Sequence, residues 1–308
     1  MKVVVVTNSL NDELCKISQE FYSQLPYEKI IVSGKDGLHN AAFIDHVIRN
    51  PQKYDFDWMV YIDEDCFITD LNALEDLIQY QIANNFSCSG VPDGGVISHR
   101  FHNPIAINPF FMIMNIGEIR KKYNIEEIWS NHYAPDLDKF IPIALIKKDF
   151  KYKPDYDKTI AKGYKPFDVI YDNFEACYSI FFWLLRHDFK MLYLDANEFN
   201  DNLTTILKNQ NGVEFAYHTW FARGWNTDVN NRKRINNVID LCNKIKNENI
   251  MKENIEMEKC SLCDKETDVP KNTPIDLRKH YVEGAGQLCD GCYLKIYDTR
   301  EDKGSDNR

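Results

Sequence analysis

The stretch Trp58-Met59-Val60-Tyr61-Ile62-Asp63-Glu64-Asp65-Cys66-Phe67-Ile68 decides how the rest of the chain is interpreted. Residues 58–62 are apolar, with aromatic and β-branched side chains, which predicts a buried strand. Adjacent acids follow, and carboxylates this close repel one another and are costly to bury without a counter-charge. Mg²⁺ and Mn²⁺ bind carboxylate oxygens, so the pattern predicts a divalent cation site at the end of this strand. The alternative is an exposed acidic turn, which the flanking apolar runs disfavour.

The size and charge of the chain limit the classes of protein to which it can belong. It has 308 residues, of which 44% are hydrophobic and 27% charged, as expected for one large or two smaller globular domains. The net charge of −10 argues against DNA or membrane binding driven by overall charge and leaves only a local basic patch open. No apolar stretch is long enough to span a bilayer, and residues 1–6 predict a first strand, not a signal peptide.

The use of cysteine indicates a reducing compartment. The chain contains nine cysteines, four of which form two close pairs near the C-terminus. The others are scattered singly, at Cys15, Cys66, Cys88, Cys177 and Cys242. Unpaired thiols without an export signal fit the cytosol, so we expect a cytoplasmic protein.

The order of elements predicts a parallel sheet. Strands are expected at 2–6, 29–32, 58–62, 87–91, 105–115 and 190–194. Helices are expected at 12–24, 38–49, 70–82, 116–122, 168–186 and 228–248, and a long loop at 147–165. The alternation of strands and helices over the first ninety residues implies right-handed crossovers. The strand ends at 7–9, 33–36 and 63–65 should then share one edge of the sheet, a crevice suited to a nucleotide.

The chain resembles the GT-A class of nucleotide-sugar glycosyltransferases over roughly residues 2–225. The Rossmann-like start and the acids Asp63-Glu64-Asp65 after an apolar strand, as in the DXD motif of that class, carry the resemblance. An acidic helix start at Asp172-Asn173-Phe174-Glu175 and a late histidine in an aromatic setting, His218, complete it. The fold class implied is α/β, with a mostly parallel sheet and helices on both faces.

By this resemblance, the metal is Mn²⁺ or Mg²⁺. Asp65 would ligate it directly, and Asp63 would hold the nucleotide ribose or bind the metal through water. His218 would supply the ligand on the far side. The metal would bridge the diphosphate of the donor and stabilise the charge that develops there as the sugar leaves. The alternative for His218 is a core histidine with its hydrogen bonds satisfied.

The resemblance also implies contacts to donor and acceptor. Asp172 or Glu175 would lie near the acceptor, where inverting members use an acid as the general base and retaining members give it other roles. Asp93, in a turn after the fourth strand, suits a contact to the donor sugar or the acceptor, or belongs only to the turn. The residues implied for the base and ribose of the donor, a UDP-sugar, are Thr7, Asn8 and Asp36.

Two Cys-x-x-Cys pairs near the C-terminus predict a zinc site. They are Cys260-Ser261-Leu262-Cys263 and Cys289-Asp290-Gly291-Cys292. Two such turns can supply the thiolates of a tetrahedral site, with His280 as a spare candidate ligand. The absence of a βαβ context disfavours redox-active dithiols. Four protein ligands leave no open coordination position on the zinc, so we expect a structural site. Residues 267–287 cannot form much of a core alone, so the metal should supply much of the stability of this module.

The stretch from His280 to Cys289 resembles small zinc modules encoded by tailed bacteriophages. Phages attach sugars to their DNA, so hydroxylated or hydroxymethylated cytosine, flipped out of the duplex, is one implied acceptor. Basic residues at 232–234 and 147–153 would help to bind DNA, whereas the net charge counts against it. A cell-surface glycan or lipopolysaccharide is the alternative acceptor. A phage-encoded protein would act in the host cytoplasm.

We therefore expect a metal-dependent hexosyl- or pentosyltransferase. Its GT-A domain would span 1–250, a zinc-ribbon-like module 256–298 and a disordered tail 299–308. One alternative is a non-catalytic nucleotide-binding or zinc-binding interaction protein on the same scaffold. Another is a nucleotidyltransferase, which would normally carry a Gly-rich loop with Lys or Arg after the first strand. Thr7-Asn8-Ser9-Leu10 lacks such a loop.

Overall fold

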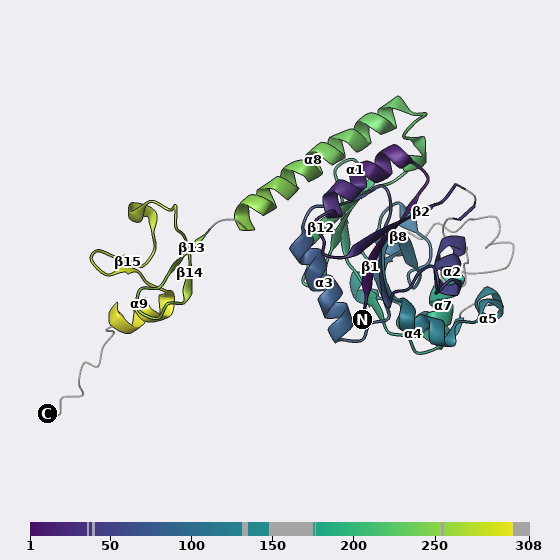
Figure 1. The fold of residues 1–308 in the computed structure, drawn as a ribbon, viewed down its shortest axis with the longest axis horizontal. Helices are drawn as coiled ribbons and strands as arrows, with labels where there is room; N and C mark the ends of the chain where they lie inside the picture. Colours follow the sequence, from purple (N-terminus) through teal and green to yellow (C-terminus); the bar gives the residue numbers. More distant parts are fainter. Residues whose placement is uncertain are drawn as a thin grey trace. The chain divides into compact units, whose positions relative to one another are not determined.

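A computed structural model describes residues 1–35, 37–38, 41–130, 135–147, 175, 177–253 and 256–297. The chain forms two compact units, Met1–Lys246 and Asn247–Arg308 (Figure 1). The expected tail 299–308, nearly all of the expected loop 147–165, Asp36 and Asp172 lie outside the described residues.

A mixed six-stranded sheet forms the centre of the first unit, in the order β2-β1-β3-β8-β5-β9. Its strands are β1 (Val3–Ser9), β2 (Glu28–Ser33), β3 (Trp58–Ile62), β5 (Cys88–Pro92), β8 (Ile107–Asn115) and β9 (Met191–Tyr193). β1 pairs in parallel with β2 and β3, and β5 pairs in parallel with β9. The sheet is therefore mostly parallel, which confirms the expected α/β class.

The central strand β8 interrupts the parallel arrangement that the first four strands predict. It runs antiparallel to both β3 and β5. Between β5 and β8 the chain forms only the short hairpin of β6 (Gly94–Ile97) and β7 (Arg100–Phe101). A parallel return needs a crossover of a dozen or more residues, usually a helix, so the chain re-enters the sheet from the same edge.

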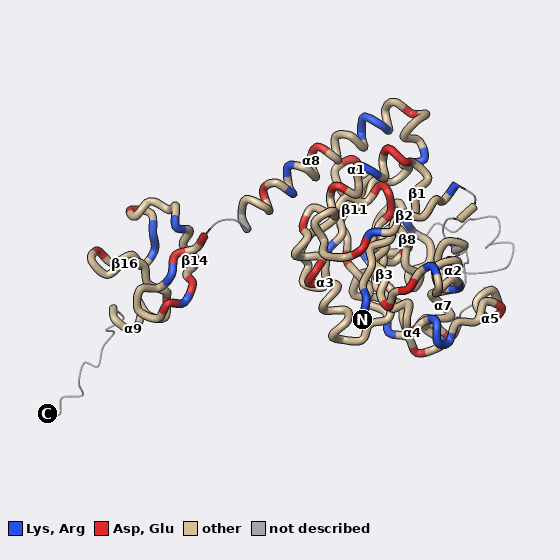
Figure 2. The backbone as a smooth tube through the Cα atoms, viewed as in Figure 1, with Lys and Arg blue, Asp and Glu red and all other residues tan. Residues whose placement is uncertain are grey.

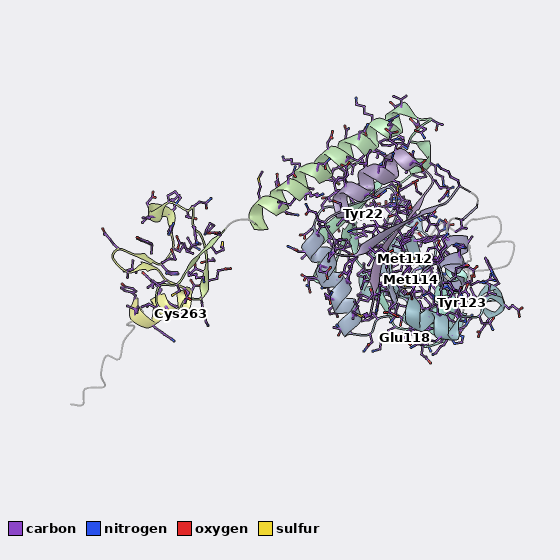
Figure 3. The ribbon with its side chains drawn as sticks, viewed as in Figure 1. Tyr22, Met112, Met114, Glu118, Tyr123 and Cys263 are labelled. Carbon is purple, nitrogen blue, oxygen red and sulfur yellow. The ribbon has the colours of Figure 1, made fainter. Side chains whose placement is uncertain are left out.

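Helices cover both faces of this sheet, and successive strand residues alternate between the two cores. α1 (Asp12–Tyr22), α3 (Leu71–Ala83) and α8 (Val229–Glu253) pack with Val5, Val60 and Ile113. α2 (Ala41–Arg49), α4 (Ile116–Lys122) and α7 (Tyr178–Arg186) pack on the other face. On that face Met112 and Met114 of β8 are fully buried (Figure 3).

Two N-caps position the helices that follow the functional strand ends. The side chain of Asn11 accepts hydrogen bonds from the backbone N–H groups of Glu13 and Leu14 at the start of α1. Asp70 accepts one from Ala73 at the start of α3. α8 runs alongside α1 (Figure 1), where Lys246 donates to the carbonyl of Glu20.

A second, four-stranded sheet in the order β10-β11-β12-β4 lies on the α1, α3 and α8 side of the core. Its strands are β10 (Ala196–Glu198), β11 (Thr204–Lys208), β12 (Glu214–Thr219) and β4 (Cys66–Ile68). β4 is the apolar run that follows the acids, so one strand links the acidic triplet to the late part of the chain. Shorter helices are α5 (Ile125–Ser130), η1 (Pro135–Phe140), η2 (Ile143–Leu145) and η4 (Ala222–Gly224).

The second unit consists of short hairpins and one helix. They are β13 (Met257–Lys259), β14 (Glu266–Pro270), η5 (Ile275–Leu277), β15 (Tyr281–Val282), β16 (Gly286–Gln287) and α9 (Asp290–Tyr297). Few of its described side chains are buried: Cys260, Thr267, Val269, Gln287 and Leu288. Across both units, no helix among the described residues has the length and apolarity that a bilayer span requires.

Candidate active site and zinc module

A cavity of ≈ 1020 Å³ opens where β1 and β3 end. Strand-end residues Asn8, Asp63 and Asp65 line one part of it, and residues from 218 onward line another. The volume is in the range of small-molecule sites. The cavity therefore lies at the carboxyl ends of parallel strands, where open α/β sheets bind ligands.

Asp63, Asp65 and His218 meet in this cavity. One ligand atom from each lies within 4.8 Å of the others. His218 Nε2 lies 3.3 Å from Asp65 Oδ1, and both side chains are nearly buried. Two carboxylates and an imidazole are a donor set that Mn²⁺ accepts, and the carboxylates also suit Mg²⁺. The residues present therefore fit a divalent cation.

Strand pairing places His218 beside Asp65. β12 runs antiparallel to β4, with His218 opposite Cys66. The backbone N–H of Thr219 donates to the carbonyl of Asp65 at 3.0 Å. The pairing of β12 with β4 thus holds His218 beside Asp65, although the two residues are 153 positions apart in the sequence. A shift of that register by one residue would turn His218 to the opposite face.

Aromatic rings fix the orientation of the His218 side chain. Phe110 stacks on the imidazole with ring centroids 4.1 Å apart and an interplanar angle of 2°. Trp220 meets it edge-on at 4.6 Å. His218 Nδ1 is buried and has no hydrogen-bond partner among the described residues. Among the described residues this imidazole therefore lacks the full set of hydrogen bonds of a satisfied core histidine, and its role as a metal ligand stays a prediction.

The other two acids of the triplet differ in their surroundings. Burial is the main cause that raises the pKa of Asp63 well above its ordinary value, and the negative charges of Asp65 and Glu64 add to the effect. Glu64 points into the scaffold: its carboxylate accepts from the backbone N–H groups of Leu10 and Asn11 at 2.9 and 2.7 Å. Ser9 also donates to it. Glu64 thus ties β3 to the start of α1, and it lines the cavity beside Asp63 and Asp65.

The predicted nucleotide contacts at the end of β1 separate into two roles. Asn8 lines the cavity, and its side chain donates to the carbonyl of Leu38 at 2.8 Å. Gly34 packs against it, because a Cβ there would lie 2.7 Å from Asn8 Oδ1. Thr7 is fully buried and bonds through its hydroxyl to Tyr22, one of the residues labelled in Figure 3. The structure therefore brings Asn8, but not Thr7, to the cavity.

Asp93 is fully buried and holds Arg100 in place. Arg100 forms a two-pronged ion pair with it, at 2.6 Å for each oxygen. Asn108 and Tyr178 donate to the same carboxylate. Burial, followed by the charge of Asp93, raises the pKa of Tyr178, which keeps that hydroxyl protonated as a donor. Arg100, not Asp93, therefore lines the cavity.

Replacing Arg100 with Met should destabilise the first unit by about 3–5 kcal/mol, because it leaves the buried Asp93 without its counter-charge. Urea denaturation followed by tryptophan fluorescence measures this, since all five tryptophans lie in the first unit. The control is Arg49→Met, which breaks an exposed pair with Asp45 and should cost less than about 1 kcal/mol. Equal losses in the two variants would contradict the buried ion-pair interpretation.

Glu175 lines the cavity, while Asp172 lies outside the described residues. The Glu175 carboxylate lies 3.4 Å from Arg100 Nη2. α7 begins at Tyr178, so Glu175 precedes this helix, and its carbonyl accepts from the Tyr178 N–H. The carboxylate is therefore free to face the cavity instead of capping the helix.

Sequence reasoning missed several residues of the cavity wall. Arg100 lies in an irregular hairpin, and no local sequence pattern connects it to Asp93 or to Trp220. Its guanidinium lies over the Trp220 ring, 5.0 Å from the ring centroid. Phe221 and Arg223 lie three and five residues after His218, so their closeness in sequence to the predicted metal ligand was the signal that could have identified them.

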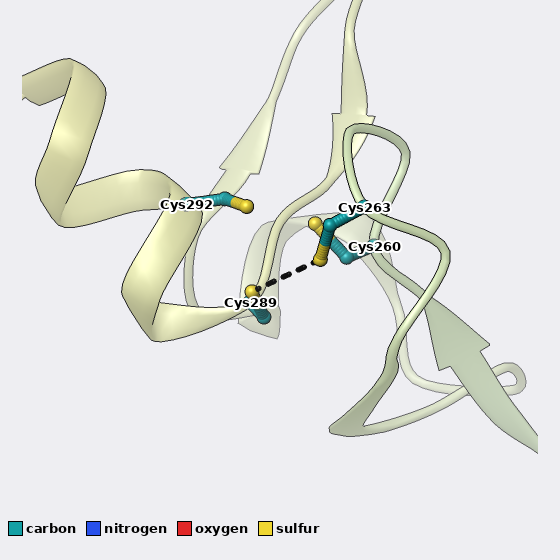
Figure 4. Close-up of side chains that lie close together, drawn as sticks. All are labelled: Cys260, Cys263, Cys289 and Cys292. Carbon is teal, nitrogen blue, oxygen red and sulfur yellow. Dashed lines mark hydrogen bonds between the residues drawn. The ribbon is translucent and has the colours of Figure 1, made fainter.

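The four cysteines of the second unit cluster (Figure 4). Their sulfur atoms lie within 4.8 Å of one another, and Cys263 Sγ and Cys289 Sγ are 3.7 Å apart. A tetrahedral zinc site with Zn–S bonds of about 2.3 Å requires sulfurs roughly 3.8 Å apart, whereas a disulfide requires about 2.0 Å. The spacing therefore suits a shared metal, and none of the four cysteines forms a disulfide in the structure.

Local structure explains how the thiols converge. Cys260 and Cys263 lie in the turn after β13, where the Asp264 N–H donates to the Cys260 carbonyl. Cys289 precedes α9 and Cys292 lies in its first turn. His280 stays outside the cluster, because its Nε2 pairs with Asp290 at 3.1 Å.

Comparisons with known proteins find distant structural neighbours. Neither the family models nor the sequences of curated proteins match this chain. Among solved structures, A197 from STIV is 12% identical with a TM-score of 0.30, over 41% of this chain and 71% of that one. A glycosyltransferase involved in the glycosylation of the major capsid of PBCV-1 is 14% identical with a TM-score of 0.28. The match covers 42% of this chain and 66% of that one, just under two thirds. Matches this distant carry no functional conclusion, which rests on the residues of the site.

Proposed function

We propose that this protein is a metal-dependent glycosyltransferase that moves a sugar from a nucleotide-sugar donor to an acceptor hydroxyl. The observation that carries the proposal is the meeting of Asp63, Asp65 and His218 in one cavity at the end of β3. These residues come from two sheets and are held by β12–β4 pairing, so the grouping is not an exposed acidic turn. The cavity is large enough for a nucleotide and a sugar.

Asp65 and His218 would hold Mn²⁺ or Mg²⁺, with Asp63 bound directly or through water. When bound, the cation supplies Lewis-acid stabilisation of the negative charge on the leaving diphosphate. The protein contributes the fixed positions of the ligands: Phe110 and Trp220 hold the imidazole, and backbone pairing holds Asp65. Fixed ligand positions keep the reacting groups in the geometry that the transfer requires.

The remaining cavity residues divide between donor and acceptor. Asn8 lies at the β1 edge, where the nucleotide of a UDP-sugar would bind. Glu175, held near Arg100, is the candidate to accept the proton of the acceptor hydroxyl in an inverting reaction. Thr7 and Asp93 support this arrangement from behind the cavity wall.

A panel of UDP-, GDP-, dTDP- and CDP-sugars tests the proposal. At least one donor should release its nucleoside diphosphate in the presence of Mn²⁺ or Mg²⁺, to water or to an acceptor, and release should fall to background without added metal. Binding of a nucleotide without any release from the panel would instead favour a non-catalytic interaction protein.

DNA as the acceptor stays a prediction, and the charges of the described residues give it little support. Figure 2 shows acidic and basic positions interspersed along both units. Within the basic triplet at 232–234, Arg232 pairs with Glu13 and Arg234 with Asp201. Lys147 pairs with Asp195. Duplex binding depends on cations that contact phosphates, and here Arg232, Arg234 and Lys147 would first have to leave their acidic partners.

For the second unit, the proposed ligand is one structural Zn²⁺ bound by Cys260, Cys263, Cys289 and Cys292. All four positions are thiolates, which leaves no open position for substrate. The backbone N–H of Cys289, with those of Leu262 and Cys263, lowers the pKa of Cys260 to about 6. Because few side chains of this unit are buried, a bound metal would supply much of its stability.

A further inference from the structure

An exposed aromatic side chain lies in the wall of the cavity, directly after the metal-site strand. Phe221 is 65% exposed, yet it lines the cavity together with His218 and Trp220. Its neighbour Trp225 is buried and donates to Glu13. The segment after β12 is thus anchored on both sides of Phe221, while the phenyl ring itself stays open to the cavity.

The backbone of Phe221 is held in a conformation that its side chain disfavours. Its φ of 68° and ψ of 31° lie in the left-handed region. The other described non-glycine residues with positive φ are of types that tolerate it: Asn85, Asp188, Asn202, Asp264 and His280. A bulky apolar residue there is an outlier, and such outliers concentrate at functional sites.

Hydrogen bonds maintain this conformation independently of the phenyl ring. The Phe221 carbonyl accepts from Asn231 Nδ2 at 2.8 Å and from the Gly224 N–H at 2.9 Å. Arg234 donates to the carbonyl of Trp220 at 2.5 Å. Glycine would satisfy the same bonds without strain. The presence of phenylalanine is therefore not explained by the local fold.

The charges around the ring limit what can bind against it. Among the described residues, the cavity is lined by the acids Asp63, Glu64, Asp65, Glu175 and Asp228. Its arginines are Arg100, Arg223 and Arg234. Arg100 and Arg234 are paired with acids, and only Arg223 makes no ion pair with the described residues. Away from the cation that Asp65 and His218 would hold for the donor diphosphate, an excess of acids repels a polyanion such as a nucleic-acid strand and tolerates an uncharged ligand.

From these observations we infer that Phe221 is the acceptor platform: its ring stacks on the apolar face of an uncharged sugar and thereby determines acceptor specificity. This inference rests on the proposed glycosyltransferase function and names its acceptor class. An aromatic ring that is exposed, rigidly placed and next to the metal site can orient a sugar hydroxyl with little loss of side-chain entropy. It favours a glycan over a nucleic acid as acceptor.

Saturation-transfer NMR on the full chain with Mg²⁺ and UDP tests the platform, with methyl glycosides of glucose, galactose and mannose as probes. At least one glycoside should receive saturation on the protons of its apolar face. In Phe221→Gly this signal should fall roughly threefold to tenfold, as expected for the loss of one aromatic contact. The thermal midpoint should stay equal or rise, because glycine relieves the backbone strain.

The control is Tyr80→Ala, which removes a partly exposed aromatic ring that does not line the cavity, and it should leave the glycoside signal unchanged. No contact with any glycoside, contact that survives in Phe221→Gly, or contact with a single-stranded DNA oligonucleotide instead would overturn the inference. Metal-dependent release of nucleoside diphosphate to water is measured in parallel. Its absence in the native protein would refute the proposed function, whereas its presence in a native protein that contacts no glycoside would overturn the platform alone.

Discussion

Asp65→Asn should lower the rate of sugar transfer roughly a thousandfold, because several kcal/mol of transition-state stabilisation depend on a correctly ligated metal. Asn keeps the size of the side chain but removes the charge that binds a hard cation. The backbone carbonyl that pairs with Thr219 is unaffected, so the register of β12 should persist. The measurement is release of nucleoside diphosphate at saturating Mn²⁺ with the best donor of the panel.

The folded state should tolerate this substitution. Removing one of three adjacent carboxylates relieves repulsion, so urea denaturation should show the variant equal to or more stable than the native protein. The matched control is Asp55→Asn, an exposed acid outside the cavity, which should keep full activity. Full activity in Asp65→Asn would rule out the metal assignment, and unfolding of the variant would show a structural role for Asp65.

Cys260→Ser should abolish zinc binding and unfold the second unit while leaving the first unit intact. Structural zinc supplies an apparent 10–16 kcal/mol in small zinc-binding peptides, far more than the few buried side chains of this unit can provide. Zinc content by elemental analysis should fall from one ion per chain to near zero. Limited proteolysis should then cut within 256–297, while the tryptophan fluorescence transition of the first unit stays unchanged.

Ser261→Ala is the control for the cysteine variant, because it alters the same turn without removing a thiolate. It deletes one hydrogen bond to the Gln287 carbonyl and should cost only about 1 kcal/mol. Zinc retained in Cys260→Ser, or a second unit that resists proteolysis without zinc, would refute metal-dependent folding.

The features that could be predicted from sequence are those encoded in local patterns. The apolar run 58–62 is a fully buried strand, and the strands and helices around it occur near the expected positions. The α/β class follows from that alternation. The spacing of the cysteine pairs predicted a cluster, and the structure forms it. Each of these features carries its signal in neighbouring residues: the strands and helices in their apolar periodicity, and the two cysteine pairs, although 25 residues lie between them, each in its own Cys-x-x-Cys spacing.

What sequence could not give depends on pairings between distant segments. β8 is antiparallel because the β6–β7 hairpin that leads into it is too short to form a crossover connection. The composition of that segment does not reveal this. The contact between Arg100 and Asp93 depends on the same hairpin. The conformation of Phe221 depends on Asn231, ten residues later, and a phenylalanine gives no sign of positive φ.

The most direct test of the account is the binding of Mn²⁺, followed by electron paramagnetic resonance. The account predicts one bound Mn²⁺ per chain in the native protein, with affinity increased by UDP, and loss of that binding in Asp65→Asn but not in Asp55→Asn. Absence of bound Mn²⁺, or equal binding in the native protein and Asp65→Asn, would contradict the claim that Asp63, Asp65 and His218 form a metal site for a nucleotide sugar.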